Sequence, residues 1–392
     1  MIMVFFSCIN LYSAHNKNMK KILKSSLIHI LIPITILMIF SILNMYNARF
    51  ISSNYSLYFI KQIIWFLLGF LSIIIICNIK PQLIFKYSHI FYILSLILLT
   101  LVLFFGKSIN GTKAWFDFKY FSFQPSEVMK LSLIIHLSKV VGNNRNRTLK
   151  GEFKLIMKVL LLTLIPAILT FLEPDTGAVI IYFIIALSIL FTYGIRARWF
   201  IIALIIITIF ATIFFLLYMN ATDTFIKIFG TNFFYRMDRI IDFKNGSGMQ
   251  LDNALIAIGS APLFGTGIHS TTIYFPEAPS DFIYALSVSN FGSLGGLIII
   301  ITYTILFLIL INKTKKMKIN IYRLYLISFI SMFIFQTIWS ISMNLGMLPI
   351  MGITLPFLSY GGTSTIIYFI SIGIIARLCY GKEKYPFRIF HR

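Results

Sequence analysis

Ten apolar stretches, most of them close to the length of one bilayer crossing, constrain the fold of this sequence more than any other feature. A helix needs about 20 apolar residues to cross a membrane. Only 12% of the 392 residues are charged, whereas soluble domains have about 25%. The sequence therefore predicts an all-α polytopic membrane protein with ten transmembrane helices. These cover approximately residues 26–46, 57–77, 87–105, 125–142, 155–172, 176–194, 199–219, 281–311, 322–343 and 362–380.

The eighth stretch, residues 281–311, is too long for a single crossing. A long hydrophobic helix tilts, kinks or projects beyond the bilayer. Glycines at 292, 295 and 296 are the expected positions for a break in this helix.

The net charge of +22 reflects topology and not an affinity for nucleic acid. With the N-terminus inside and the spans alternating, most of the 34 basic residues fall at cytoplasmic ends, as the positive-inside bias requires. Of the 12 acidic residues, all but Glu152 and Glu383 fall in spans or at the outer side. Both termini are therefore predicted to be cytoplasmic, and no nucleic-acid partner is expected.

The chain is expected to contain one membrane domain, residues 26–380, with its largest outer loop at 220–280 between spans 7 and 8. Residues 1–25 form a cytoplasmic lead-in, with Met19 as an alternative start, and residues 381–392 form a cytoplasmic tail. The first span is predicted to be an uncleaved anchor, because it is too long for a signal peptide and nine more spans follow. Cys77 and Cys379 lie near inner ends of spans, so no outer disulfide framework is expected.

Chemistry is expected at the outer mouth of the bundle, because the longer loops lie there. One of them, residues 344–361, is rich in Gly and Pro. Irregular backbone cannot face lipid, so this segment must pack on protein or line a watery pocket. Ser359, Tyr360 and Ser364 would supply hydroxyls there.

Glu127 lies in the first turn of the fourth predicted span, which Pro125 opens, and Lys130 follows three residues later. Residues three apart share one face of a helix. One interpretation is a helix-capping acid beside a lysine that reaches toward the interface. The other is an intramembrane ion pair that faces a cavity.

Asp175 begins the sixth predicted span after a tight outer turn that also contains Glu173 and Pro174. Aspartate is a preferred N-cap residue, so a purely structural role is one interpretation. A second carboxylate that lines a shared cavity is the other.

Asp281 is placed where the outer loop ends and the eighth apolar stretch begins. An ionisable group at such a boundary is a functional candidate. In the loop before it, Arg236, Arg239 and Lys244 alternate with acids. These basic residues either form a solvated face or bind the pyrophosphate of a lipid-linked substrate. Residues 250–259 fit a short amphipathic helix.

The sequence shows no metal-ligand constellation, because His136 and His269 are isolated and HExxH and CxxC are absent. No resident cofactor is therefore predicted, although a bound Mg²⁺ could assist at a pyrophosphate.

Five segments together resemble the SEDS family of membrane proteins (RodA, FtsW and SpoVE), and the short tail is more similar to RodA. They are NGTKAWF with FQPSEVMKLS, EPDTGA, the YR-containing loop, FPEAPSDFIYAL and LPIMGITLPFLSYGGTS, in that order along residues 20–380. The resemblance implies ten transmembrane helices in the bacterial cytoplasmic membrane. It implies a peptidoglycan glycosyltransferase that polymerises lipid II at the outer face, with a class B penicillin-binding protein as partner.

The resemblance also implies roles for individual residues. The essential aspartate of the family corresponds to Asp281 in SDFIY, which would be the catalytic base. The cavity residues correspond to Glu127, Lys130 and Asp175, and the LPFxSYGGSS segment to residues 355–364, with Ser359, Tyr360, Gly361, Gly362 and Ser364.

Two positions depart from the family pattern. Pro279-Ser280 replaces His-Thr before the aspartate, and Ser289-Asn290 replaces a pair of glutamates. If those acids support the base or hold a cation, this chain has lost that support.

Two other classes of function fit the same residues. Ionisable groups within spans and a broken segment also suit a flippase or transporter of lipid-linked precursors. A catalytically weak scaffold of the cell-wall synthesis complex is the third possibility.

Overall fold

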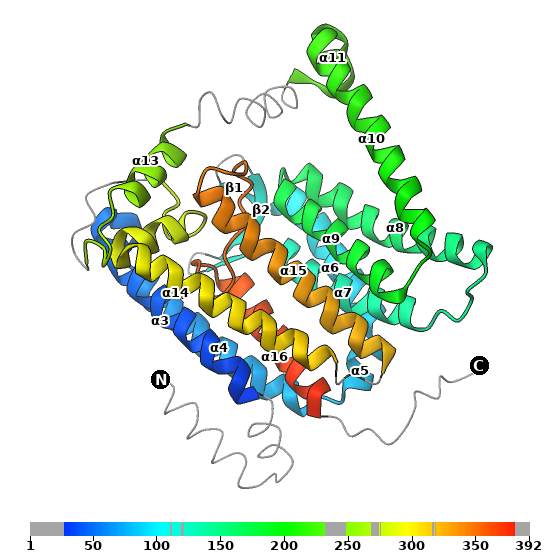
Figure 1. Cartoon of the computed structure of the whole chain (residues 1–392), viewed down its shortest axis with the longest axis horizontal. Coiled ribbons are helices and arrows are strands. Elements are labelled where there is room, and N and C mark those ends of the chain that lie inside the picture. The colour runs from blue at the N-terminus through cyan, green and yellow to red at the C-terminus, as the bar shows by residue number, and fades with distance from the viewer. Residues whose placement is uncertain are drawn as a thin grey trace.

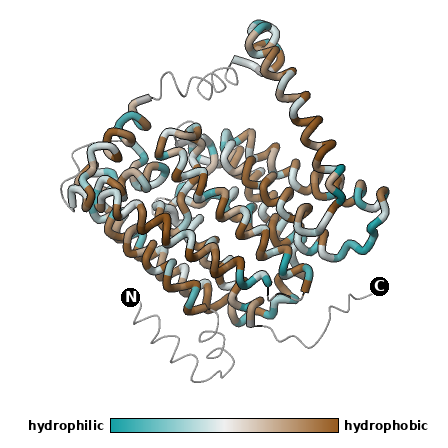
Figure 2. The backbone as a smooth tube through the Cα atoms, in the orientation of Figure 1, coloured by the Kyte–Doolittle hydropathy of each residue, from teal (hydrophilic) through white to brown (hydrophobic). Residues whose placement is uncertain are grey.

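The computed structural model describes residues 27–109, 112–118, 121–231, 248–267, 274, 276–315, 317 and 319–380. Within this part of the chain, nine helices are long and apolar enough to cross a membrane. They are α3 (Ile28–Ile51), α4 (Tyr58–Asn78), α6 (Ser88–Phe105), α8 (Leu149–Leu172), α9 (Thr176–Tyr193), α10 (Ala197–Asn220), α14 (Ile283–Thr314), α15 (Asn320–Asn344) and α16 (Gly362–Tyr380). Residues of hydrophobic character make up most of the length of these helices (Figure 2).

The remaining predicted span is present as helix α7 (Pro125–Gly142). It contains Glu127, Lys130 and Lys139 and is therefore too polar to count as a span by composition. Most of its residues are buried, and it contacts α6, α8, α9, α15 and α16. A helix with protein on all sides does not need a lipid-compatible surface. The membrane-protein fold is confirmed, and the count of ten spans stays a prediction.

Helices from distant parts of the sequence pack side by side in the bundle (Figure 1). The main pairs are α4 with α16, α9 with α15, and α3 with α14. Short helices complete the membrane part: η2 (Ser53–Tyr55), α5 (Pro81–Lys86) and α11 (Thr222–Phe229). Helix α10 extends away from the others and has no buried residue.

The break predicted in the eighth stretch is found at Gly292, which has φ 72° inside α14. A side chain there would collide with the carbonyl oxygen of Leu263, because the 263–267 backbone crosses α14 at this point. The amide of Leu294 donates to that same carbonyl over 3.3 Å. Glycine is needed both for the positive φ and for the close approach.

Two segments of the outer loops have regular structure. The first loop forms a small antiparallel sheet that the sequence did not predict, with β1 (Lys107–Ile109), β2 (Thr112–Asp117) and β3 (Ser122–Phe123) in the order β1-β2-β3. The predicted helix at 250–259 is confirmed as α13 (Gly248–Gly259), whose Leu251, Ala254 and Ala257 are buried. It packs mainly on α14.

Candidate active site

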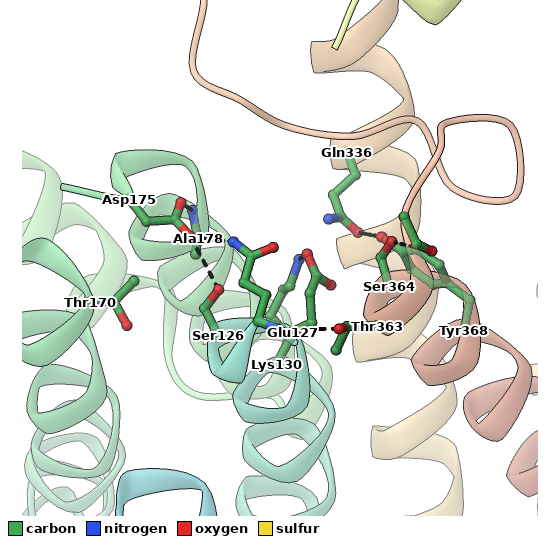
Figure 3. A network of polar contacts seen from close by, with 12 residues as sticks. Ser126, Glu127, Lys130, Thr170, Asp175, Ala178, Gln336, Thr363, Ser364 and Tyr368 are labelled. Carbon is green, nitrogen blue, oxygen red and sulfur yellow. Dashed lines mark hydrogen bonds and ion pairs between the residues drawn. The ribbon is translucent and has the colours of Figure 1, made fainter. Parts of the chain in front are cut away.

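A small polar cavity lies where α7, α9 and α15 meet the irregular segment that follows α15. It is small, with a cavity volume of about 10 Å³, which is room for about one water molecule. Three of the predicted site residues line it: Glu127, Lys130 and Asp175. The other lining residues are Gln124, Ala178, Ile181, Gln336, Gly352, Ile353 and Thr354. Figure 3 shows Glu127 and Lys130 of α7 between Asp175, which precedes α9, and Gln336 of α15.

Glu127 and Lys130 form an ion pair on α7, with 2.7 Å between Oε1 and Nζ. Their side chains are 7% and 4% exposed, so the charges are desolvated. Such a pair is retained only when each partner compensates the other. The ion-pair interpretation of these residues is therefore confirmed, and both side chains face the cavity.

Asp175 combines the two roles considered from the sequence. Its Oδ1 accepts a hydrogen bond from the amide of Ala178 at 3.0 Å and so caps α9. Its Oδ2 accepts from Gln124 Nε2 at 3.0 Å and from Ser126 Oγ at 3.1 Å. The carboxylate thus joins α7 to α9 at the cavity wall (Figure 3).

Asp281 lies two residues before the start of α14 and is partly exposed. A Cβ atom built on Gly352, a cavity-lining residue, would lie 3.9 Å from its Oδ2. Burial raises the pKa of the Asp281 carboxyl to about 7, with further contributions from the charges of Glu277 and Asp175. The structure therefore places Asp281 beside the cavity formed by Glu127, Lys130 and Asp175.

Three consecutive carbonyl groups of the Asp281 loop accept hydrogen bonds from outside the loop. The amide of Tyr360 donates to Pro279 O at 2.8 Å, and Ser359 Oγ donates to Ser280 O at 2.6 Å. Asn344 Nδ2 donates to Asp281 O at 2.9 Å. We call these three bonds the carbonyl clamp. They show that the irregular segment after α15 packs on protein, which is one of the two environments that its composition predicted.

The predicted residues of the 359–364 segment are placed around this clamp and not in the cavity lining given above. Ser359 Oγ also accepts from the amide of Leu355 at 2.9 Å, and the ring of Tyr360 stacks on Tyr58. Gly362 packs against the indole of Trp65. Ser364 Oγ donates to Gly361 O at 3.3 Å.

Two glutamines of the cavity were missed by sequence reasoning. Gln336 lines it from α15, where its Oε1 accepts from Tyr368 OH at 2.8 Å. Gln124 donates to Asp175. An amide in the middle of the apolar stretch 322–343 was the available signal for Gln336, since polar groups within spans face the bundle interior.

Ser289 and Asn290, the pair that the resemblance places at two glutamates, contact α3 and the 263–267 segment and do not line the cavity. Asn290 is 1% exposed, and its Nδ2 donates to Asn44 Oδ1 on α3 at 2.8 Å. Asn47 Nδ2 donates to Asn290 Oδ1. The main-chain carbonyl of Ser289 accepts from Thr266. An amide at 290 therefore ties α14 to α3.

The structure gives none of the predicted ligands of a pyrophosphate, and no group of metal ligands, within the described residues. Arg236, Arg239 and Lys244, the candidates for pyrophosphate binding, lie outside the described residues. Over the described residues, no group of three or more His, Cys, Asp or Glu side chains could hold a metal ion.

Comparisons with known proteins agree with this architecture. The cell cycle protein family model FTSW_RODA_SPOVE matches residues 22–384. The chain is 32% identical over 342 residues to "Probable peptidoglycan glycosyltransferase FtsW" of Coxiella burnetii, covering 83% of this chain and 87% of that protein. It is 33% identical over 339 residues to the protein of the same name from Buchnera aphidicola subsp. Acyrthosiphon pisum, covering 82% and 80%.

Solved structures share the fold. A peptidoglycan synthase complex, described for its coordination of polymerization and crosslinking, contains a chain with a TM-score of 0.73 and 23% identity, covering 89% of this chain and 96% of that chain. The crystal structure of the rod shape determining protein RodA of Thermus thermophilus gives a TM-score of 0.64 at 23% identity, covering 89% and 95%. Together with the family model, these matches place the chain: it belongs to the FtsW, RodA and SpoVE family of cell cycle proteins.

Proposed function

We propose that this multi-pass protein of the bacterial inner membrane is a peptidoglycan glycosyltransferase that polymerises lipid II at the outer face. The observation that carries the proposal is the position of Asp281. Its carboxyl lies beside a polar cavity, and its pKa of about 7 suits a group that accepts a proton near neutral pH. The family relationship supplies the reaction class.

In the proposed reaction, a hydroxyl of the acceptor sugar attacks the anomeric carbon of the donor. The bond from that carbon to the lipid pyrophosphate breaks, and the pyrophosphate leaves with the electron pair. Asp281 accepts the proton of the attacking hydroxyl as general base. Developing negative charge on the pyrophosphate needs cations nearby. Arg236, Arg239 and Lys244 of the same outer loop, or a bound Mg²⁺, are the proposed source of that charge.

The cavity residues have a supporting role in this proposal. The Glu127–Lys130 pair and Asp175 fix the polar ends of α7 and α9 at the cavity. The cavity has room for about one water molecule, so these residues shape the protein beside Asp281 and do not enclose a sugar. A class B penicillin-binding protein is proposed as the partner that crosslinks the product, since a structural relative is part of a complex that coordinates polymerization and crosslinking.

The test is polymerisation of purified lipid II by detergent-solubilised protein, with and without a co-expressed penicillin-binding protein. We expect glycan polymer from the native protein and none from Asp281→Asn, which keeps the size of the side chain but removes the base. A flippase would make no polymer and would need a sealed bilayer. A scaffold would bind the partner without product under any metal condition. Native activity in Asp281→Asn would remove Asp281 from the mechanism.

A further inference from the structure

Helix α14 begins two residues after Asp281, and no local side chain caps its first turn. Its N-cap residue, Phe282, has no side chain able to accept a hydrogen bond. The first amides of any helix have no partner within the helix and need one from elsewhere. The amide of Leu286 is satisfied by Phe282 O at 3.0 Å. The amide of Ala285 must find an acceptor outside the helix.

Asn344 supplies that acceptor from the last residue of α15. Its Oδ1 accepts from the amide of Ala285 at 3.0 Å, although the two residues are 59 positions apart. Ala285 is the third residue of α14, the same position that a local N-cap side chain reaches. Asn344 therefore acts as the N-cap of a helix to which it does not belong.

The nitrogen of the same side-chain amide, Nδ2 of Asn344, bonds to the main chain of Asp281. Asn344 Nδ2 donates to Asp281 O at 2.9 Å and to Ser340 O of its own helix at 2.7 Å. Both amide hydrogens and the amide oxygen are thus in use. The side chain is fully buried, at 0% exposure, so the orientation of the amide is fixed by its three partners.

We infer that Asn344 is a positioning residue for the reaction: one buried amide sets the first turn of α14 and the main chain of Asp281 together. The inference rests on the proposed role of Asp281. The other two bonds of the carbonyl clamp hold Pro279 and Ser280 from a different segment. Asn344 is the member of the clamp that couples Asp281 to a transmembrane helix.

Two variants separate the two functions of the amide. Asn344→Leu has a similar size and removes all three bonds. Asn344→Asp keeps the acceptor for Ala285 but loses the donor to Asp281 O. Thr337→Val is the matched control, because Thr337 is also buried on α15 and, within the described part of the chain, donates only to Phe333 O of its own helix.

We expect kcat for lipid II polymerisation to fall by about 10- to 100-fold in both Asn344 variants, as for a base displaced by a fraction of an ångström, with KM changed much less. In Asn344→Leu, the acid limb of the pH profile should also move toward lower pH, because a loosened carboxyl gains solvent. Thr337→Val should keep the native profile. A purely structural role would lower the amount of folded protein and leave kcat and the pH profile of the folded fraction unchanged.

Hydrogen exchange gives a readout that does not depend on activity. In Asn344→Leu, the amides of residues 283–286 should exchange about tenfold faster or more, and in Thr337→Val they should not. Two results would overturn the positioning role. One is a native exchange rate of these amides in Asn344→Leu. The other is a native kcat in Asn344→Leu, provided that the wild type is active and Asp281→Asn is inactive. If Asp281→Asn polymerises normally, the proposed function fails instead, and exchange alone decides whether Asn344 sets this turn.

Discussion

The hydroxyl of Ser359 donates to the main-chain carbonyl of Ser280 over 2.6 Å, across 79 positions of the sequence. It joins the irregular segment between α15 and α16 to the residue next to Asp281. The same oxygen accepts from Leu355 at 2.9 Å. Ser359 thus connects the fold of its own loop with that of the Asp281 loop.

Replacing Ser359 by alanine should therefore loosen both loops at once. A buried donor, the amide of Leu355, and a partly buried acceptor, the carbonyl of Ser280, would lose their partner, which costs about 1–3 kcal/mol of unfolding free energy. We expect a lower melting temperature in detergent and a lower kcat for lipid II polymerisation. Ser328→Ala is the control, because Ser328 is buried and, among the described residues, its hydroxyl bonds only to Leu324 of its own helix. Equal effects of the two variants would contradict this account.

The Glu127–Lys130 pair should show a large asymmetry between single and double substitutions. Lys130→Met leaves the Glu127 carboxylate buried without its cation, which costs about 3–5 kcal/mol. The double variant Glu127→Gln/Lys130→Met removes both charges and should recover most of that loss. Chemical unfolding of the variants in detergent measures the difference. A single variant as stable as the native protein would show that the pair is not desolvated.

Activity should depend on the protonation of one carboxyl with a pKa of about 7. Burial, then Glu277, then Asp175 raise the pKa of Asp281, and only the deprotonated form accepts a proton. We expect kcat/KM to fall by about tenfold per pH unit below pH 7 and to level off above it. Glu277→Gln removes one negative charge and should move this limb to lower pH. A profile that is flat between pH 5 and 8 would count against Asp281 as base.

Stability should depend on pH through Glu173, in the turn between α8 and α9. Its side chain is fully buried, and neither oxygen has a hydrogen-bond partner among the described residues. Burial, and then the charge of Asp175, raise its pKa from 4.5 to about 8. The unfolded chain therefore releases this proton at lower pH than the folded protein does. The stability contributed by the protonated form is complete below pH 4.5 and is lost as the pH rises to about 8.

Glu173→Gln should remove this dependence, because a neutral amide has no proton to lose in that range. The expected result is a flatter plot of unfolding free energy against pH between 5 and 8 for the variant than for the native protein. Parallel plots would show that Glu173 ionises normally in the folded state.

Restoring an acid at position 290 should harm this protein. Asn290 donates to Asn44 and accepts from Asn47 in a buried site. Asn290→Asp keeps the acceptor but loses the donor and buries a charge, so it should lower stability by a few kcal/mol. We expect less polymer and a lower melting temperature from this variant. Higher activity at native stability would instead show that the missing acid limits catalysis.

The sequence predicted what depends on hydropathy and on short spacing. Helices α9 and α16 begin and end within a residue of the predicted stretches, because Asp175 and Gly194 mark the ends of one and Gly362 the start of the other. The Glu127–Lys130 pair followed from a spacing of three residues. The sheet β1-β2-β3 was missed, because its strands are only two to six residues long.

The carbonyl clamp could not be predicted in the same way. Its acceptors are main-chain oxygens, which leave no mark on the sequence, and its donors lie 63 to 81 positions away. For the same reason Asn344 looked like an ordinary polar residue at the end of an apolar stretch. Only its three partners in the structure distinguish it.

The three bonds of the carbonyl clamp are all accepted by main-chain oxygens, and this has a consequence for substitution in the Asp281 loop. Every amino acid brings the same carbonyl, so residues 279 and 280 can be exchanged without loosening the hold on their neighbour. The resemblance puts His-Thr where this chain has Pro279-Ser280, and such an exchange would leave these bonds intact. The position of Asp281 depends instead on the donors, Asn344, Ser359 and the amide of Tyr360.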